Sequence, residues 1–125
     1  MNWLLVGVGG ALGSIARYGL NQLVQQRTAA NFPLGIFVIN IAGSLAIGVV
    51  GGLAVSGRWP LSPEARTFIV VGLLGGFTTF SSFSLDTLTL LRSGHSGQAL
   101  LNVAGQVGLS LIGVWIGYRL AASPV

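Results

Sequence analysis

Four long apolar stretches, separated only by short polar connections, fill almost the whole chain. They run over about residues 3–24, 33–55, 65–91 and 98–121. An α-helix needs about 20 mostly apolar residues to cross the hydrocarbon core of a bilayer. Such helices satisfy their backbone polar groups internally, as lipid requires. The sequence therefore predicts an all-α membrane protein with a single domain of four transmembrane helices per subunit.

The charge content supports lipid as the solvent of this chain. Only 6% of the 125 residues are charged and 52% are hydrophobic, whereas soluble domains carry about 25% charged residues. The net charge is +4, but the arginines are scattered singly, and nucleic-acid binding requires clustered basic residues. We therefore expect the lipid bilayer, and no nucleic acid, as a partner.

Several chemistries are excluded by the residues present. The chain has no cysteine and one histidine, which excludes disulfides and zinc sites built from these ligands. No paired carboxylates and no serine–histidine–acid set occur in plausible positions, so we do not expect an enzyme. The first stretch lacks a basic leading segment, and Arg17 interrupts it. We therefore expect a retained span and not a signal peptide.

The arginines near the ends of the stretches give almost no preferred orientation. Three lie on the N-terminal side of the membrane and two on the other, namely Arg58, Arg66 and Arg119 against Arg27 and Arg92. Orientation follows the excess of such charges on the cytoplasmic side. A chain without that excess can insert both ways and pair antiparallel with itself. Four short helices enclose little interior, which also favours an oligomer.

Each stretch contains two glycines four residues apart. The pairs are Gly9 with Gly13, Gly48 with Gly52, Gly72 with Gly76, and Gly113 with Gly117. Small residues at this spacing let helix backbones approach closely in lipid. Ordinary glycine enrichment is the alternative, but a pair in all four stretches favours tight packing and leaves the partners open.

The third stretch is longer than the bilayer requires, and its middle weakens a helix. Paired glycines and β-branched threonines lie between Gly75 and Ser84. A break would expose carbonyls, which can hold a cation as in interrupted transporter helices. The alternative is a polar helix interface whose hydroxyls bond back to the backbone. Ser62, Pro63 and Glu64 predict a helix start, and Ser96 is a candidate cap for the fourth helix.

Polar and aromatic residues inside the stretches are candidates for an ion path. Phe80 and Phe83 share a helix face, and their positive ring edges suit a small anion, although packing alone would also explain them. Asn40 needs a partner inside its apolar stretch. It either bridges two helices or donates N–H bonds to an anion.

The fourth stretch carries a polar stripe of Asn102, Gln106 and Ser110 at four-residue spacing, which ends at Val114. Uncharged donors suit an ion that must not bind too tightly, and a hydrogen-bonded helix contact is the alternative. Arg17 and Asp86 are charges in or near the membrane, which makes them functional candidates. Alternatively, Arg17 reaches a water-filled vestibule or caps a helix end, and Asp86 lies at a vestibule.

The sequence resembles the Fluc (CrcB) family of fluoride channels over nearly its whole length. The most specific match is GGFTTFSSFS over residues 75–84, close to the family's GGxTTFSTFS signature. GGALGSIARY over residues 9–18 and PLGIFVIN over residues 33–40 support it.

The resemblance implies an antiparallel, dual-topology homodimer with a broken third helix and two pores. These would export fluoride passively across the bacterial inner membrane and so lower cytoplasmic fluoride. A structural sodium ion at the dimer centre would be held by backbone carbonyls of Gly75 and Thr78 from both subunits. Carried over by position, the pore residues are Asn40, Phe80, Phe83, Asn102, Gln106 and Ser110, and the vestibule residues are Arg17 and Asp86.

Three positions depart from the family pattern. Ile36 and Val114 stand where threonine is common, and Asp86 where glutamate is common, so the access route for the ion can differ. Two other functions stay open. A small multidrug exporter would need a carboxylate deep in the first stretch, which has none. A non-transporting assembly or regulatory subunit is the second.

Overall fold

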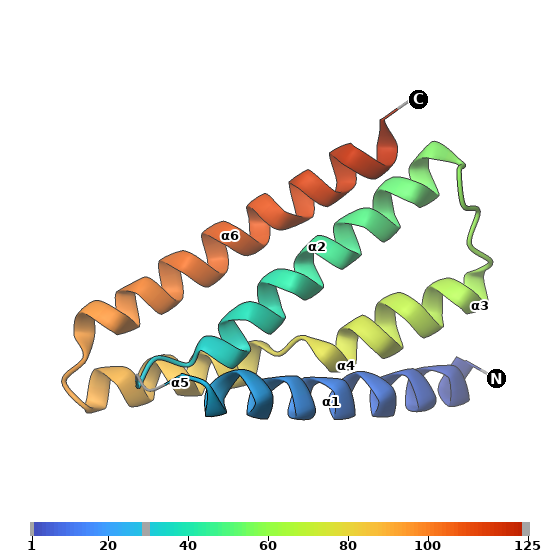
Figure 1. Ribbon diagram of the computed structural model, residues 1–125. Helices are drawn as coiled ribbons and strands as arrows, with labels where there is room; N and C mark the ends of the chain where they lie inside the picture. The colour runs from blue at the N-terminus through green and yellow to red at the C-terminus, as the bar shows by residue number, and fades with distance from the viewer. Residues whose placement is uncertain (1, 29–30, 124–125) are drawn as a thin grey trace.

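The computed structural model describes residues 2–28 and 31–123, and every regular element in these ranges is helical. Four helices are long and apolar enough to cross a membrane, over residues 2–26, 34–56, 63–92 and 96–122. Figure 1 shows them as long rods joined by short loops. In chain order the elements are α1 (Asn2–Gln26), α2 (Leu34–Ser56), α3 (Pro63–Arg66), η1 (Thr67–Leu74), α4 (Gly75–Phe77), α5 (Phe80–Arg92) and α6 (Ser96–Ala122).

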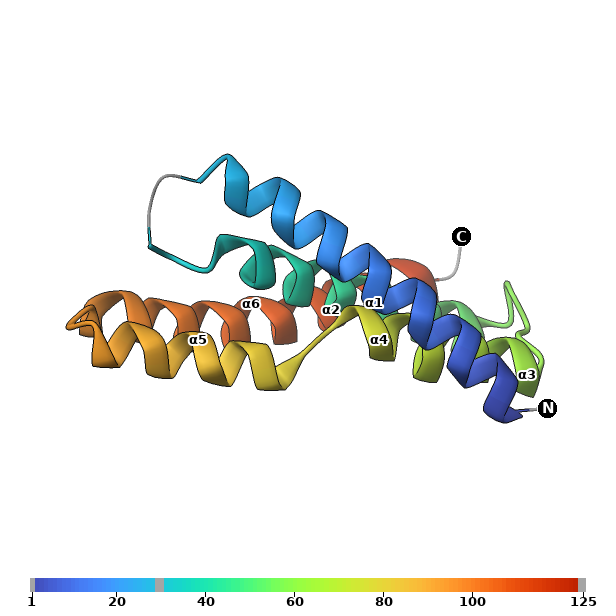
Figure 2. The ribbon, with the colours of Figure 1, turned by 90° about the horizontal axis from the view of Figure 1, so that it is seen from below.

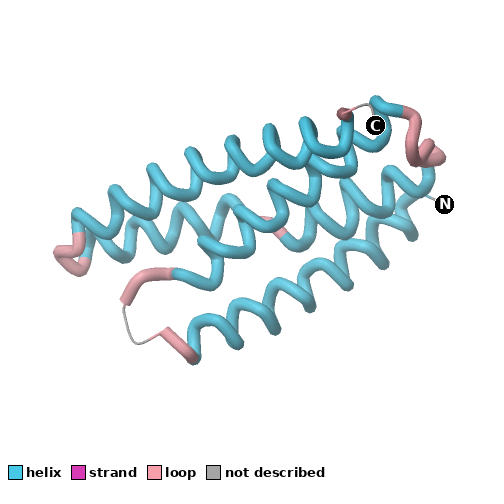
Figure 3. The backbone as a smooth tube through the Cα atoms, turned by 45° about the horizontal axis from the view of Figure 1, so that its top comes forward, coloured by secondary structure: helices cyan, strands magenta, loops and turns pink. Residues whose placement is uncertain are grey.

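The third span consists of several segments. The short α3 leads into the π-helix η1 and then into α4, which ends at Phe77. Thr78 and Thr79 are extended, with φ/ψ of −88°/156° and −152°/119°. Helix α5 begins at Phe80, and the pink interruption in Figure 3 lies between the two parts. The backbone thus leaves helical geometry inside the glycine- and threonine-rich segment.

Of the two helix caps predicted from the sequence, the structure confirms one and contradicts the other. Ser62 caps α3, because its hydroxyl accepts a hydrogen bond from the Ala65 N–H at 3.1 Å, and Pro63 occupies the first turn. The expectation that Ser96 caps the fourth helix is wrong. Ser96 is itself the first residue of α6, and His95 precedes it without a capping side-chain bond.

The glycine pairs form two close helix seams. Helix α1 packs on η1 and α4, so a Cβ on Gly9 would lie 2.8 Å from the Phe68 carbonyl oxygen. Across the same seam, a Cβ on Gly76 would lie 2.6 Å from the Gly10 carbonyl oxygen. Figure 2 shows α1 crossing this part of the third span. Side chains at these positions would push the helices apart, which explains the glycines.

The second seam joins α2 and α6, which run side by side in the same direction (Figure 1). A Cβ on Gly52 would lie 2.5 Å from the Tyr118 carbonyl oxygen, and one on Gly48 would collide with the Val114 carbonyl. These partners follow one register, 66 residues apart. The same offset joins Asn40 to Gln106. The seam therefore keeps one alignment from its polar end to its glycine end.

The apolar core of the single chain is small, as befits helices surrounded by lipid. Ile36, Ile39 and Phe83 form a buried cluster, with Leu20 and Phe77 packed against it. This cluster ties α1 and α2 to the third span on both sides of its interruption.

Candidate functional site

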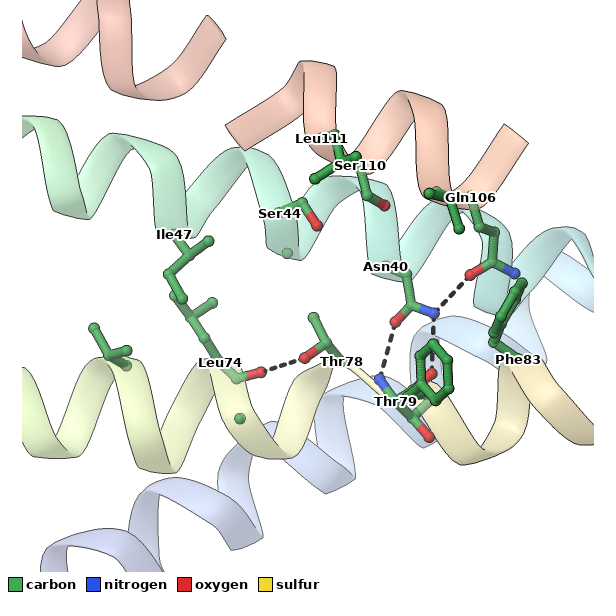
Figure 4. A pocket seen from close by; sticks show the side chains of 15 residues that line it. Asn40, Ser44, Ile47, Leu74, Thr78, Thr79, Phe83, Gln106, Ser110 and Leu111 are labelled. Carbon is green, nitrogen blue, oxygen red and sulfur yellow. Dashed lines mark hydrogen bonds between the residues drawn. The ribbon is translucent and has the colours of Figure 1, made fainter. Parts of the chain in front are cut away.

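An open pocket of about 420 Å³ lies between α2, α6 and the interrupted third span. Its lining combines amides, hydroxyls, rings and aliphatic side chains, and Figure 4 shows it from close by. No charged side chain is among the described residues that line it. The polar and aromatic members of the lining are Asn40, Ser44, Thr78, Thr79, Phe80, Phe83, Gln106 and Ser110.

Asn40 pairs with the backbone at the helix interruption. The Thr79 N–H donates to Asn40 Oδ1 at 2.9 Å, and Asn40 Nδ2 donates to the Thr79 carbonyl at 3.0 Å. The two bonds are drawn in Figure 4. They satisfy peptide groups that the extended backbone removes from helical bonding. They also fix which way the amide points, because its oxygen must face the N–H.

The amide chain continues from Asn40 through the fourth span. Asn40 Nδ2 donates to Gln106 Oε1 at 2.7 Å, and Gln106 Nε2 donates to Asn102 Oδ1 at 2.9 Å. Asn102 Nδ2 donates to the Thr87 hydroxyl at 3.0 Å, which donates to the Phe83 carbonyl at 2.8 Å. Every bond points the same way, starting at the Thr79 N–H and ending on α5. The helix bridge expected for Asn40 is therefore present.

The hydrogen-bonded amides of the fourth span have N–H donors left over, whereas their oxygens are all occupied. Asn102 is fully buried and Gln106 is 4% exposed. A primary amide nitrogen carries two N–H groups. The Asn102 and Gln106 amides each donate only one hydrogen bond to the described part of the protein. The Asn102 and Gln106 oxygens each accept a bond. The surplus is two buried N–H donors, which favours an anion or a water molecule over a cation nearby.

The two phenylalanines adopt different environments. Phe83 is 8% exposed and packs in the core, whereas Phe80 is 77% exposed. Their ring centroids lie 5.3 Å apart with planes tilted by 51°. Both line the pocket. Packing in the core accounts for Phe83, whereas the Phe80 ring is left uncovered by its own chain.

The carbonyls named for a cation lose their helical donors. In a continuous helix the N–H of Thr79 would serve Gly75, and that of Ser82 would serve Thr78. Instead the Thr79 N–H donates to Asn40, and the Ser82 N–H donates to the Thr79 hydroxyl at 3.2 Å. Gly75 and Thr78 both line the pocket. Their oxygens are chemically suited to a hard cation. The Thr78 hydroxyl, by contrast, bonds back to the Leu74 carbonyl at 3.0 Å.

The two vestibule candidates are not joined in this chain. Arg17 on α1 is partly exposed, and no ion pair links it to Asp86 on α5. One carboxylate oxygen of Asp86, Oδ2, is buried without a partner among the described residues. Arg17 and Asp86 therefore remain separate charges.

Two of the three positions that depart from the family pattern have structural roles. Ile36 is 7% exposed and packs against Phe83 in the core. Val114 presents its backbone to Gly48, where α2 and α6 touch directly. The polar stripe thus ends where the pocket between the helices closes.

Ser44 is a pocket residue that the sequence analysis missed. It lies on α2, one helical turn after Asn40, and lines the pocket with Ser110. The signal was available, because a spacing of four places two polar residues on one helix face. Ser44 stands between Gly43 and Leu45 without a longer polar stripe on its own helix, so the spacing alone is a weak signal.

Comparisons with known proteins agree with this architecture. The family described as CrcB-like protein, Camphor Resistance (CrcB), matches residues 4–118. A protein of Thermus thermophilus named fluoride-specific ion channel FluC is 50% identical over 123 residues, covering 98% of this chain and 97% of the relative.

Relatives from other bacteria carry the same name. One from Opitutus terrae is 48% identical over 95% of this chain and 91% of its own length. One from Paramagnetospirillum magneticum is 47% identical over 97% and 95%. Together with four helices of spanning length, these matches make the chain an integral multi-pass membrane protein of a channel family and not an enzyme. The chain belongs to the CrcB family.

Proposed function

We propose that this chain forms a fluoride channel that lets fluoride leave the cytoplasm passively. The observation that carries the proposal is an uncharged pocket lined by Gln106. This buried amide, like Asn102 one helical turn before it, has one N–H donor to spare. Donors without a fixed positive charge can replace the hydration of an anion without trapping it. The names of the relatives point to fluoride as the anion.

We further propose that the working unit is an antiparallel homodimer in the bacterial inner membrane. The pocket is open, and Phe80, which lines it, is 77% exposed. A second copy would cover this ring and complete the wall. The near balance of arginines at the two membrane sides supports insertion in both orientations. Antiparallel pairing of such copies would produce two equivalent pores.

A structural sodium ion at the dimer centre is part of the proposal. The Gly75 and Thr78 carbonyls fit this role, because both lack their usual helical N–H partners. Interrupted helices in other membrane proteins coordinate sodium in this way. Among residues 2–28 and 31–123 no cluster of three acidic, histidine or cysteine side chains offers a rival metal site. Two carbonyls from each subunit would surround the ion.

The multidrug-exporter alternative is disfavoured by the first span. Proton-coupled exchange of a cation would require a carboxylate in the membrane interior, and residues 3–24 contain none. The pocket also lacks a charged lining residue. A subunit without transport activity is separated from a channel by flux alone.

The direct test is fluoride release from vesicles that contain the purified protein. Vesicles loaded with potassium fluoride should empty when a potassium ionophore carries the counter-charge, with the same pH on both sides. A fluoride electrode would follow the release. Release that requires an imposed proton gradient would refute the passive mechanism, and no release would refute the channel.

The orientation is tested by lysines added beside Arg27 and Arg92. These charges should drive all copies one way, so that the variant alone loses activity. Co-expression with a partner that carries extra lysines near Arg58 and Arg119 should restore it. A C-terminal tag found on one side only, in active wild-type protein, would contradict the antiparallel dimer.

A further inference from the structure

Ser44 and Ser110 occupy equivalent places on the two helices that wall the pocket. Asn40 and Gln106 are 66 residues apart and hydrogen-bonded, and the next helical turn brings Ser44 and Ser110 to the same offset. Figure 4 shows both hydroxyls pointing into the space between α2, α6 and the third span. The two serines therefore form the next pair along the seam after the amides.

Both hydroxyls lack the backbone bond that several other hydroxyls in the spans make. A helical serine or threonine can bond back to the carbonyl one turn earlier. Ser84 does so to Phe80 at 2.9 Å, and Thr87 to Phe83 at 2.8 Å. Within the part of the chain that the structure describes, neither the Ser44 nor the Ser110 hydroxyl makes a hydrogen bond to the protein. Each is available to a ligand.

The pair lies at the end of the polar part of the pocket. The following turn brings Gly48 against the Val114 backbone, and the apolar side chains of Ile47 and Leu111 line the pocket as well. Both serines are partly buried, and a hydroxyl beside apolar side chains lacks a partner unless something in the pocket accepts its hydrogen. A small anion that accepts strong hydrogen bonds meets this need.

We infer that Ser44 is a fluoride-contacting residue, which donates its hydroxyl hydrogen to the anion opposite Ser110. The inference rests on the proposed channel function. It extends the donor path from the fourth span to both walls of the pocket. An anion that leaves the spare amide N–H groups would then pass between two hydroxyl donors before the helices close.

The test is the fluoride efflux of four proteins in identical vesicles. Ser44→Ala should lower the flux by about tenfold or more, because a hydrogen bond to a charged group is lost. Ser44→Thr, which retains the hydroxyl, should keep most of the wild-type flux. Ser56→Ala is the matched control on the same helix, because its hydroxyl bonds back to the Leu53 carbonyl at 3.1 Å, away from the pocket. It should match the wild type.

The outcomes separate this inference from the function on which it rests. No fluoride flux in the wild type would refute the channel itself. Wild-type flux together with equal flux in Ser44→Ala would overturn the role of Ser44 alone, as would a loss in Ser44→Thr as large as in Ser44→Ala. Should Ser44→Ala not be recovered as an assembled protein, Ser44→Cys, a weaker donor, should show reduced flux, and unreduced flux would again overturn the role.

Discussion

The two halves of the α2–α6 seam share one register but have opposite characters. At one end Asn40 meets Gln106 through a hydrogen bond of 2.7 Å, and the helices leave room for an open pocket. At the other end Gly48 and Gly52 lie against the backbone of α6 with no room for a side chain. Close packing at the glycine half fixes the register of α2 and α6. In the polar half, the same register places amides and hydroxyls opposite each other. The same pair of helices thus provides both the close glycine contacts and two walls of the pocket.

The largest effect is expected from breaking the glycine half. Gly48→Leu would place a side chain against the Val114 carbonyl, so the helices cannot keep their register. We expect loss of the assembled protein, seen as aggregation in size-exclusion chromatography. Gly19→Leu is the matched control, because a Cβ there meets nothing within 4 Å. Normal elution of Gly48→Leu would show that the seam is not tight.

The next effect comes from the polar half. Asn40→Asp keeps an oxygen for the Thr79 N–H but cannot donate to the Thr79 carbonyl or to Gln106. Acceptors would then face acceptors, and each buried polar group left without its partner costs about 1–3 kcal/mol. We therefore expect the fluoride flux to fall by about a hundredfold. Gln22→Glu makes the same chemical change at an exposed amide on α1 and should conduct normally. Equal flux in both variants would remove Asn40 from the site.

The two rings give a smaller and divided effect. Phe80→Ile and Phe83→Ile should both lower the fluoride flux while the dimer still assembles, because isoleucine has no positive ring edge. Only Phe83→Ile should also lower the free energy of unfolding, by about 1 kcal/mol, since that ring packs on Ile36 and Ile39. Flux assays and thermal melts together check this. Wild-type flux in both variants would show that the rings only pack.

The smallest effect distinguishes two glycines of one helix. A Cβ on Gly113 would stand 3.5 Å from its nearest neighbour, whereas one on Gly117 would stand 2.5 Å from the Leu45 carbonyl oxygen. Gly113→Ala should therefore leave the melting temperature unchanged, and Gly117→Ala should lower it. The opposite ranking would contradict the geometry of the seam.

Much of the fold followed from the sequence because lipid imposes simple demands. Four apolar stretches of spanning length predicted four helices, and the small-residue pairs predicted close seams. The partners of the seams could not be predicted, because any glycine pair suits any other. The structure joins Gly9 and Gly76 to one seam and Gly48 and Gly52 to the other. Ser96 lies inside α6 and does not cap it, which shows that a single residue does not determine where a helix begins.

The site was predicted in its residues more than in its connections. The polar stripe of Asn102, Gln106 and Ser110 was visible at helical spacing. That Asn40 would join the stripe to the Thr79 backbone was not visible, because the contact spans 39 residues and depends on the extended backbone there. Ser44 was missed because its meaning comes from the opposite helix.

The measurement that tests the account most directly compares two anions in one preparation. Vesicles with the wild-type protein are loaded with both fluoride and chloride, and a potassium ionophore supplies the counter-charge. If a pocket with a spare hydrogen-bond donor and no fixed charge selects the anion, fluoride is released rapidly while chloride stays inside. Release of both anions, or of neither, would contradict it.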